Sequence, residues 1–196
     1  MKIKMKIKKS KAFTLVEILT VVFLGALIIL AAWTAYIISY KSYQRNSQSA
    51  ELTQNGRIAL ERITRDLRQA VELVTVLPED PGVGTPPAEI KFQDGHDLWP
   101  TTGQIQYITY YLSGTDLYRK VSHFAFPSQP AEWVLWSTTG SEGTLPTEYT
   151  DLNQIKAQNI SQLQFWGEDV IIISFNVSNG TSTYSFETKV LGRNIQ

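Results

Sequence analysis

The chain contains no cysteine and only two histidines among its 196 residues. Without cysteine there is no disulfide framework, no thiolate metal site and no cysteine nucleophile, and two histidines leave little for an imidazole zinc site. No G-x-S-x-G sequence, P-loop or dinucleotide-binding fingerprint occurs. Asp94, His96 and Asp97 stand close together, but their polar, glycine-containing segment favours a solvated turn over a metal site. We therefore expect no enzyme, no cofactor and no metal.

Acidic residues are missing from the first 16 positions, where six lysines are found. These lysines are Lys2, Lys4, Lys6, Lys8, Lys9 and Lys11. Beyond this basic leader the chain carries 12 basic and 18 acidic side chains, a net charge of −6. An acidic body disfavours nucleic acid as a partner, so the basic leader needs an explanation of its own.

Charged side chains are also missing from residues 18–40, a run of 23 largely apolar positions. This run exceeds the roughly 20 residues that a helix needs to cross a bilayer. The lysines before it predict an N-terminus in the cytoplasm, with the rest of the chain beyond the inner membrane. A cleaved secretory signal is disfavoured, because the run is long and no A-x-A site follows it. A simple uncleaved anchor stays compatible with the run.

Glu17 is unusual beside such a run, because a carboxylate costs up to ~2.5–3.5 kcal/mol at the centre of a membrane helix. It ends the sequence K-A-F-T-L-V-E, residues 11–17. This sequence resembles the leader of type IV prepilins and pseudopilins, in which a basic segment and a small residue precede F-T-L-x-E. The resemblance implies that a membrane prepilin peptidase cuts between Ala12 and Phe13 and methylates the new Phe13 amine. Ala12 stands where the family usually has glycine.

The same resemblance implies a partner for Glu17. After the cut, the α-amine of Phe13 would be protonated at neutral pH, one helical turn away from Glu17. In the family, the glutamate of one subunit meets the phenylalanine amine of its neighbour during filament assembly, so that the two charges neutralise each other in lipid. Glu17 is thereby implied to serve assembly and recognition by the peptidase.

Residues 41–74 contain no proline and repeat apolar residues at three- and four-residue spacing. This spacing predicts that one helix runs from Phe13 to about Val74. Charges at i,i+4 spacing predict a solvated face on its other side, and they are Arg57, Glu61 and Arg65, and Arg62 with Asp66. The apolar side of this helix needs a sheet to cover it.

The remaining sequence alternates turn residues with short β patterns. Prolines and glycines predict a connecting segment over 77–103, interrupted by a short strand at 89–92. Ser113-Gly114-Thr115 predicts a hairpin. Further strand candidates are 104–112, 116–123, 132–136, 160–165, 169–177 and 183–191.

The order of these elements predicts an α+β, pilin-like fold, in which a long N-terminal helix packs on an antiparallel β-sheet. We expect four parts along the chain. They are a basic leader at 1–12, a membrane-spanning helix half at 13–40, an amphipathic helix half at 41–76 and an extracytoplasmic sheet domain at 77–196.

Three later segments resemble the J-type minor pseudopilin of type II secretion, and they are residues 54–70, 117–121 and 188–194. The resemblance implies a minor subunit at or near the tip of a type II secretion pseudopilus or type IV pilus. Its implied partners are the prepilin peptidase, the inner membrane, and other minor and major pseudopilins or pilins. The residues leave type II secretion, type IV pili and DNA-uptake pili open. The alternative is an uncleaved single-pass anchor that tethers an extracytoplasmic binding domain, and residues 13–17 argue against it.

Overall fold

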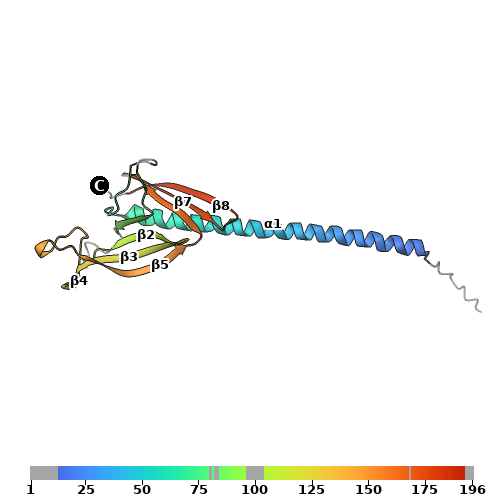
Figure 1. Ribbon diagram of the computed structural model, residues 1–196, viewed down its shortest axis with the longest axis horizontal. Coiled ribbons are helices and arrows are strands. Elements are labelled where there is room, and N and C mark those ends of the chain that lie inside the picture. Colours follow the sequence, from blue (N-terminus) through green and yellow to red (C-terminus); the bar gives the residue numbers. More distant parts are fainter. Residues whose placement is uncertain (1–12, 80, 82–83, 96–103, 168, 193–196) are drawn as a thin grey trace, which may run out of the picture. The chain divides into compact units, whose positions relative to one another are not determined.

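Helix α1 (Leu15–Gln69) is the longest element of the protein. The computed structural model describes residues 13–79, 81, 84–95, 104–167 and 169–192. The chain divides between Gln48 and Ser49 into two units, which are described separately below. The first unit holds the apolar beginning of α1, and the second holds the end of α1 and all the named strands (Figure 1). A long apolar helix followed by antiparallel sheets confirms the predicted α+β class.

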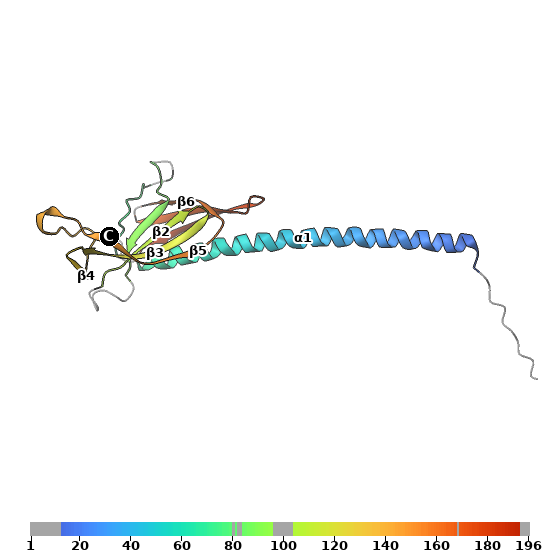
Figure 2. The same ribbon diagram turned by 60° about the horizontal axis from the view of Figure 1, so that its bottom comes forward.

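The larger sheet has five antiparallel strands, with β3 at its centre (Figure 2). One edge of β3 pairs with β2 and then with β4, and the other pairs with β5 along most of its length. Its strands are β1 (Glu89–Gln93), β2 (Tyr107–Ser113), β3 (Asp116–Phe126), β4 (Gln129–Val134) and β5 (Thr147–Ala157). A short 3₁₀ helix, η1 (Ser141–Gly143), lies between β4 and β5.

The smaller sheet has three antiparallel strands in the order β6-β7-β8. They are β6 (Ile160–Trp166), β7 (Val170–Ser178) and β8 (Thr183–Leu191). Strand β7 shows strict period-two burial, with Ile171, Ile173, Phe175 and Val177 buried. This alternation places one face of the sheet on the core and leaves the other toward solvent.

The predicted hairpin is confirmed at β2–β3. Ser113 pairs with Asp116, so Gly114 and Thr115 form a two-residue turn. Gly114 has φ +65°, a left-handed conformation that glycine adopts without steric cost. Strand β5 was not predicted, because its sequence is largely polar. As an edge strand it is mostly exposed, and polar residues suit that position.

The end of α1 packs its apolar stripe against both sheets. Leu52, Ala59, Ile63 and Leu67 are buried in one cluster with side chains from the strands. Each fully buried leucine or isoleucine contributes about 1.5–3 kcal/mol relative to an exposed one. Gly56 lies against the ring of Phe186 on β8, and a Cβ at this position would come within 2.3 Å of that ring. Glycine therefore permits the close approach of helix and strand.

The helix ends at Gln69, so the predicted end at about Val74 was wrong. Residues 71–74 instead run beside β1, where the Val71 amide donates to the Gln93 carbonyl (3.1 Å) and the Val74 amide to the Lys91 carbonyl (2.9 Å). The Gln93 amide donates back to the Glu72 carbonyl (2.8 Å). Pairing with β1 outweighs the weak helix propensity of this valine-rich segment.

The predicted solvated position of Asp66 was also wrong. Asp66 is buried, with 6% of its surface exposed, and its Oδ2 accepts hydrogen bonds from Arg119 Nε (2.6 Å) and the Tyr110 hydroxyl (2.7 Å). Burial, reinforced by the Asp66 charge and hydrogen bond, raises the pKa of Tyr110. This network joins α1 to β2 and β3 by charge-assisted hydrogen bonds.

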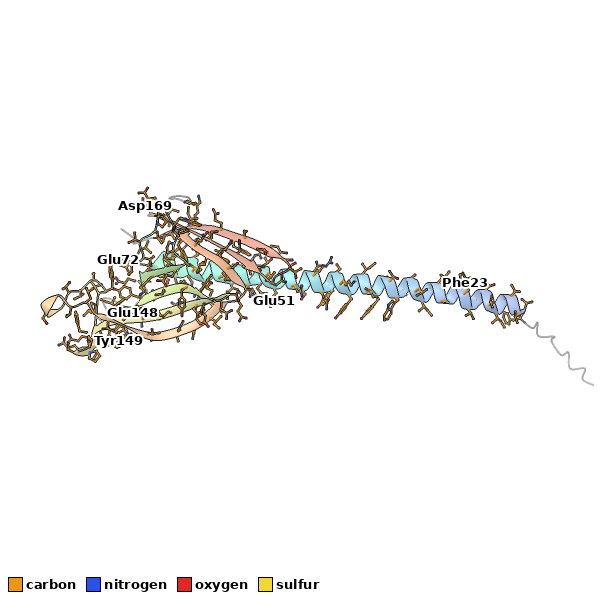
Figure 3. All side chains as sticks on the ribbon, in the orientation of Figure 1. Phe23, Glu51, Glu72, Glu148, Tyr149 and Asp169 are labelled. Atoms are coloured by element: carbon orange, nitrogen blue, oxygen red, sulfur yellow. The ribbon has the colours of Figure 1, made fainter. Side chains whose placement is uncertain are left out.

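A second charged cluster surrounds Glu148 on β5, a residue that is labelled in Figure 3. Its carboxylate accepts from Lys91 Nζ (2.7 Å), Lys120 Nζ (2.9 Å) and the Ser122 hydroxyl (2.7 Å). Burial alone would raise the pKa of Glu148, but these three hydrogen bonds lower it to about 2. The ion pairs therefore join β1, β3 and β5.

Acid is expected to weaken this cluster. The folded pKa lies below the ordinary value of 4.5, so its stabilisation is present above pH 4.5 and is lost as the pH falls toward 2. Because the carboxylate is partly exposed, solvent screening limits the loss to about 1–2 kcal/mol. Urea unfolding of the detergent-solubilised chain between pH 6 and 2 measures it. In Glu148→Gln, the free energy of unfolding should change less between pH 6 and pH 2. If the variant shows the same pH dependence as the unmodified chain, Glu148 is not the group responsible.

Candidate functional site

The predicted processing segment lies directly before the helix. Ala12 falls outside the described residues, whereas Phe13 and Thr14 are described and precede α1. The predicted helix start at Phe13 is therefore two positions early. The Thr14 carbonyl accepts from the amides of Glu17 (3.1 Å) and Ile18 (3.2 Å), and Thr14 Oγ1 also accepts from the Glu17 amide (3.3 Å). Thr14 is the N-cap of α1.

This cap explains why the helix begins where it does. Thr14-Leu15-Val16-Glu17 has the S/T-x-x-E spacing of a capping box, so the sequence itself carries a signal for a helix that starts after Thr14. Phe13, the residue before the cap, is exposed. The backbone at Phe13 and Thr14, on the C-terminal side of the predicted cut, is thus non-helical.

Glu17 lies in the first turn of α1, and its side chain is exposed. Within the described part of the chain, its carboxylate has neither a hydrogen bond nor an ion pair. A negative charge in the first turn of a helix is favourable, because the amides there carry partial positive charge. The position leaves the carboxylate available to a group from outside the chain.

The surface around Glu17 is apolar on every side of the helix. Large apolar side chains stand out from the first unit, as Phe23 does in Figure 3. Those at least half exposed between residues 13 and 30 are Phe13, Leu15, Val16, Ile18, Leu19, Val21, Val22, Phe23, Leu24, Ile28, Ile29 and Leu30. By length and composition, α1 can cross a membrane. A helix that is apolar all round suits a lipid environment or a bundle of such helices.

Polar groups within this apolar part are satisfied by the helix itself. Thr20 Oγ1 donates to the Val16 carbonyl (2.7 Å), and Thr34 Oγ1 donates to the Leu30 carbonyl (2.9 Å). A hydroxyl bonded in this way costs little in lipid, where no water can serve as its partner. These two threonines are therefore compatible with a membrane-spanning helix, and Glu17 is the one acidic residue in the window from 13 to 50.

Aromatic rings follow along one side of the first unit. The Trp33 and Tyr36 ring centroids are 6.0 Å apart, those of Tyr36 and Tyr40 are 6.2 Å apart, and Gln44 Nε2 donates to the Tyr40 hydroxyl (3.0 Å). Aromatic side chains of this kind gather at membrane interfaces, where one end is apolar and the other is hydrated. A role in setting membrane depth stays a prediction.

The histidine candidates do not form a site in the described residues. His96 and Asp97 lie outside the described residues, and no group of three metal-ligating side chains is found in the part of the chain that the structure describes. His123 is in β3, stacked on Trp133 with centroids 4.3 Å apart, and its Nδ1 lies 2.9 Å from Asp151. These contacts link β3 to β4 and β5.

Comparison with known proteins bears on the N-terminal segment. Residues 7–33 match the family described as Prokaryotic N-terminal methylation motif. No curated protein sequence matches the chain. The matched span contains Ala12, Phe13, Thr14, Glu17 and the first part of the apolar helix, and it supports a relation to the type IV pilin and pseudopilin superfamily. Together with the apolar helix, it indicates membrane anchoring and processing by a prepilin peptidase.

Proposed function

We propose that this chain is a minor pilin or pseudopilin, assembled at or near the tip of a type II secretion pseudopilus or a type IV pilus. The observation that supports it most directly is the methylation motif at residues 7–33, which spans the start of an exposed apolar helix. The proposed work of the protein is assembly, with no catalytic residue and no cofactor. Its proposed partners are the prepilin peptidase and companion pilin-like subunits.

In this proposal the leader stays in the cytoplasm, and the peptidase cuts between Ala12 and Phe13. The new Phe13 amine is methylated, and the apolar part of α1 stays in the inner membrane until assembly. The sheet-containing part of the chain lies on the extracytoplasmic side. The domain divisions predicted at 12, 40 and 76 belong to the same proposal, and the boundary after residue 40 marks the expected outer face of the membrane.

The proposed role of Glu17 follows from its surroundings. An exposed carboxylate within an apolar surface is costly in lipid and is stabilised by an opposite charge. The Phe13 amine of a neighbouring subunit supplies that charge once the leader is removed. A role in recognition by the peptidase is also proposed for Glu17, because only four residues separate it from the cut.

Processing is the first step to test. In cells that contain a prepilin peptidase, mass spectrometry should find a chain beginning at Phe13 with a methyl group on its α-amine. In cells lacking the peptidase, the chain should keep its leader. Replacing Ala12 by a bulky residue such as tryptophan should block the cut, because the last leader side chain must fit the protease. A chain that keeps its leader in peptidase-containing cells, while filaments form normally without it, would contradict the proposal and favour the uncleaved anchor.

A further inference from the structure

Four arginines lie on the part of α1 that belongs to the second unit: Arg57, Arg62, Arg65 and Arg68. No lysine occurs between residues 49 and 70. We call these arginines, together with Ile58 and Glu61, the arginine face. Except for Arg62, which is half-buried, its members are exposed.

Most of the arginine face, all of it except Arg62, lies away from the core. Positions 57, 61, 65 and 68 follow one another at helical spacing, and each helical residue turns by about 100°. They therefore stand on the side opposite Ile63 and Leu67, which are fully buried against the sheets. Arg57, Arg65 and Arg68 are exposed, so the packing of the described residues does not account for arginine at these positions.

Internal ion pairs account for little of this charge. Among the described residues, Arg57, Arg62 and Arg68 have no acidic side chain within 4.0 Å. Arg65 Nε lies 3.8 Å from Asp66, a carboxylate that Arg119 already holds at 2.6 Å. The Nε of Arg62 is buried without a hydrogen-bond partner in the described part of the chain. The predicted i,i+4 pairs are thus not formed.

The positive face contrasts with the rest of the unit. Residues 71–196 contain 14 acidic and 6 basic side chains, so the sheet region is strongly acidic while the helix beside it presents arginine. Guanidinium groups bind carboxylates in a planar, bidentate geometry and are enriched at protein interfaces, whereas lysine is depleted there. A face that only conferred solubility would not need arginine at all four basic positions.

The arginine face also contains an exposed apolar side chain, and a shallow hollow lies at one end of it. Ile58 is 44% exposed between the arginines, which suits an apolar anchor inside a charged contact. A shallow hollow of about 470 Å³ lies at the end of the face and is lined by Ser49, Ala50, Thr53, Gln54 and Arg57. Ser49, Ala50 and Thr53 in its lining are small and leave space beside the Arg57 side chain.

We propose that the arginine face docks onto an acidic surface of the neighbouring protein subunit in the filament. This inference rests on the proposed function and adds the chemistry of one subunit contact. The occupant is a protein surface bearing clustered carboxylates, to which Arg57, Arg65 and Arg68 are complementary. Complementary charge chiefly sets the orientation and choice of partner, so the face selects which subunit lies beside α1.

Photocrosslinking of the full chain in its native host tests this docking. A photoreactive amino acid replaces Ile58, and a second version carries it at Thr183, an exposed position on β8. We expect Ile58 adducts to companion subunits at peptides rich in Asp and Glu, and at most weak adducts from Thr183. Arg57→Glu should reduce the Ile58 adduct about tenfold, since 1.4 kcal/mol corresponds to a tenfold change. Lys189→Glu, a matched charge reversal at an exposed site, should leave it unchanged.

The outcomes separate the two proposals. A chain that is present in sheared filaments but gives no Ile58 adduct, or adducts only to lipid, overturns the docking and leaves the proposed function standing. Adducts that map to a surface without carboxylates, or that survive Arg57→Glu, also overturn it. A chain absent from the filaments overturns the proposed function, and with it this contact.

Discussion

Replacing Asp66 by alanine is expected to lower the free energy of unfolding by about 3–5 kcal/mol, the usual cost of removing one partner of a buried ion pair. The substitution leaves the largely buried guanidinium of Arg119 without its carboxylate and removes the acceptor of the Tyr110 hydroxyl. Urea unfolding of the detergent-solubilised chain, followed by tryptophan fluorescence, measures the loss. Glu61→Ala, at an exposed acidic position five residues earlier on the same helix, is the matched control.

A second comparison separates the ion pair from simple packing. Asp66→Leu combined with Arg119→Met removes both charges, so the double variant should be more stable than Asp66→Ala. If Asp66→Ala costs less than about 1 kcal/mol, the range of an exposed ion pair, then the network does not hold the helix to the sheet.

Glu17→Ala is expected to leave the chain inserted in the membrane but to impair its recruitment into filaments. Removing the carboxylate eases insertion of the isolated helix. In the assembled bundle, however, the neighbouring Phe13 amine would be an unpaired charge in lipid, at a cost of about 3–5 kcal/mol. The chain has no cysteine, so Tyr43→Cys provides a unique attachment point for crosslinking to companion subunits.

The Glu17→Ala variant is tested by its membrane insertion and processing on one hand, and by its crosslinking to companion subunits on the other. Membrane fractionation and N-terminal mass should show Glu17→Ala inserted and cut, while the Tyr43→Cys crosslink decreases. Glu51→Ala, an exposed glutamate in the second unit, should keep the crosslink. Undiminished crosslinking together with undiminished piliation or secretion would mean that Glu17 has no part in assembly.

Much of the fold could be predicted because its elements have strong local signals. The charge-free run, the Gly114 turn and the alternating pattern of β7 each depend on residues within one element. The end of α1 could not be predicted in this way, because residues 71–74 pair with β1, which lies about 20 positions away in the chain. Strand β5 was missed for a similar reason, since its pairing with β3 compensates for a polar sequence.

The candidate sites show the same division. Glu17 and Phe13 belong to a short contiguous motif, so their interest is visible in the sequence alone. Asp66 follows Ile63 by three positions and Ala59 by seven, which places it on the apolar stripe, but its i,i+4 spacing from Arg62 suggested a solvated pair. Only the arrangement of β2 and β3 shows that Arg119 and Tyr110 donate hydrogen bonds to the buried Asp66 carboxylate.

The Thr14 cap has a consequence for when processing can take place. The first carbonyl that α1 uses belongs to Thr14, so a cut before Phe13 would break none of the hydrogen bonds that define the helix. Among the described residues, the hydrogen bonds that start α1 are therefore the same with and without the leader. Under the proposed function, the peptidase would then act on a subunit whose helix is already formed, and the cut would control when assembly begins rather than whether the helix folds.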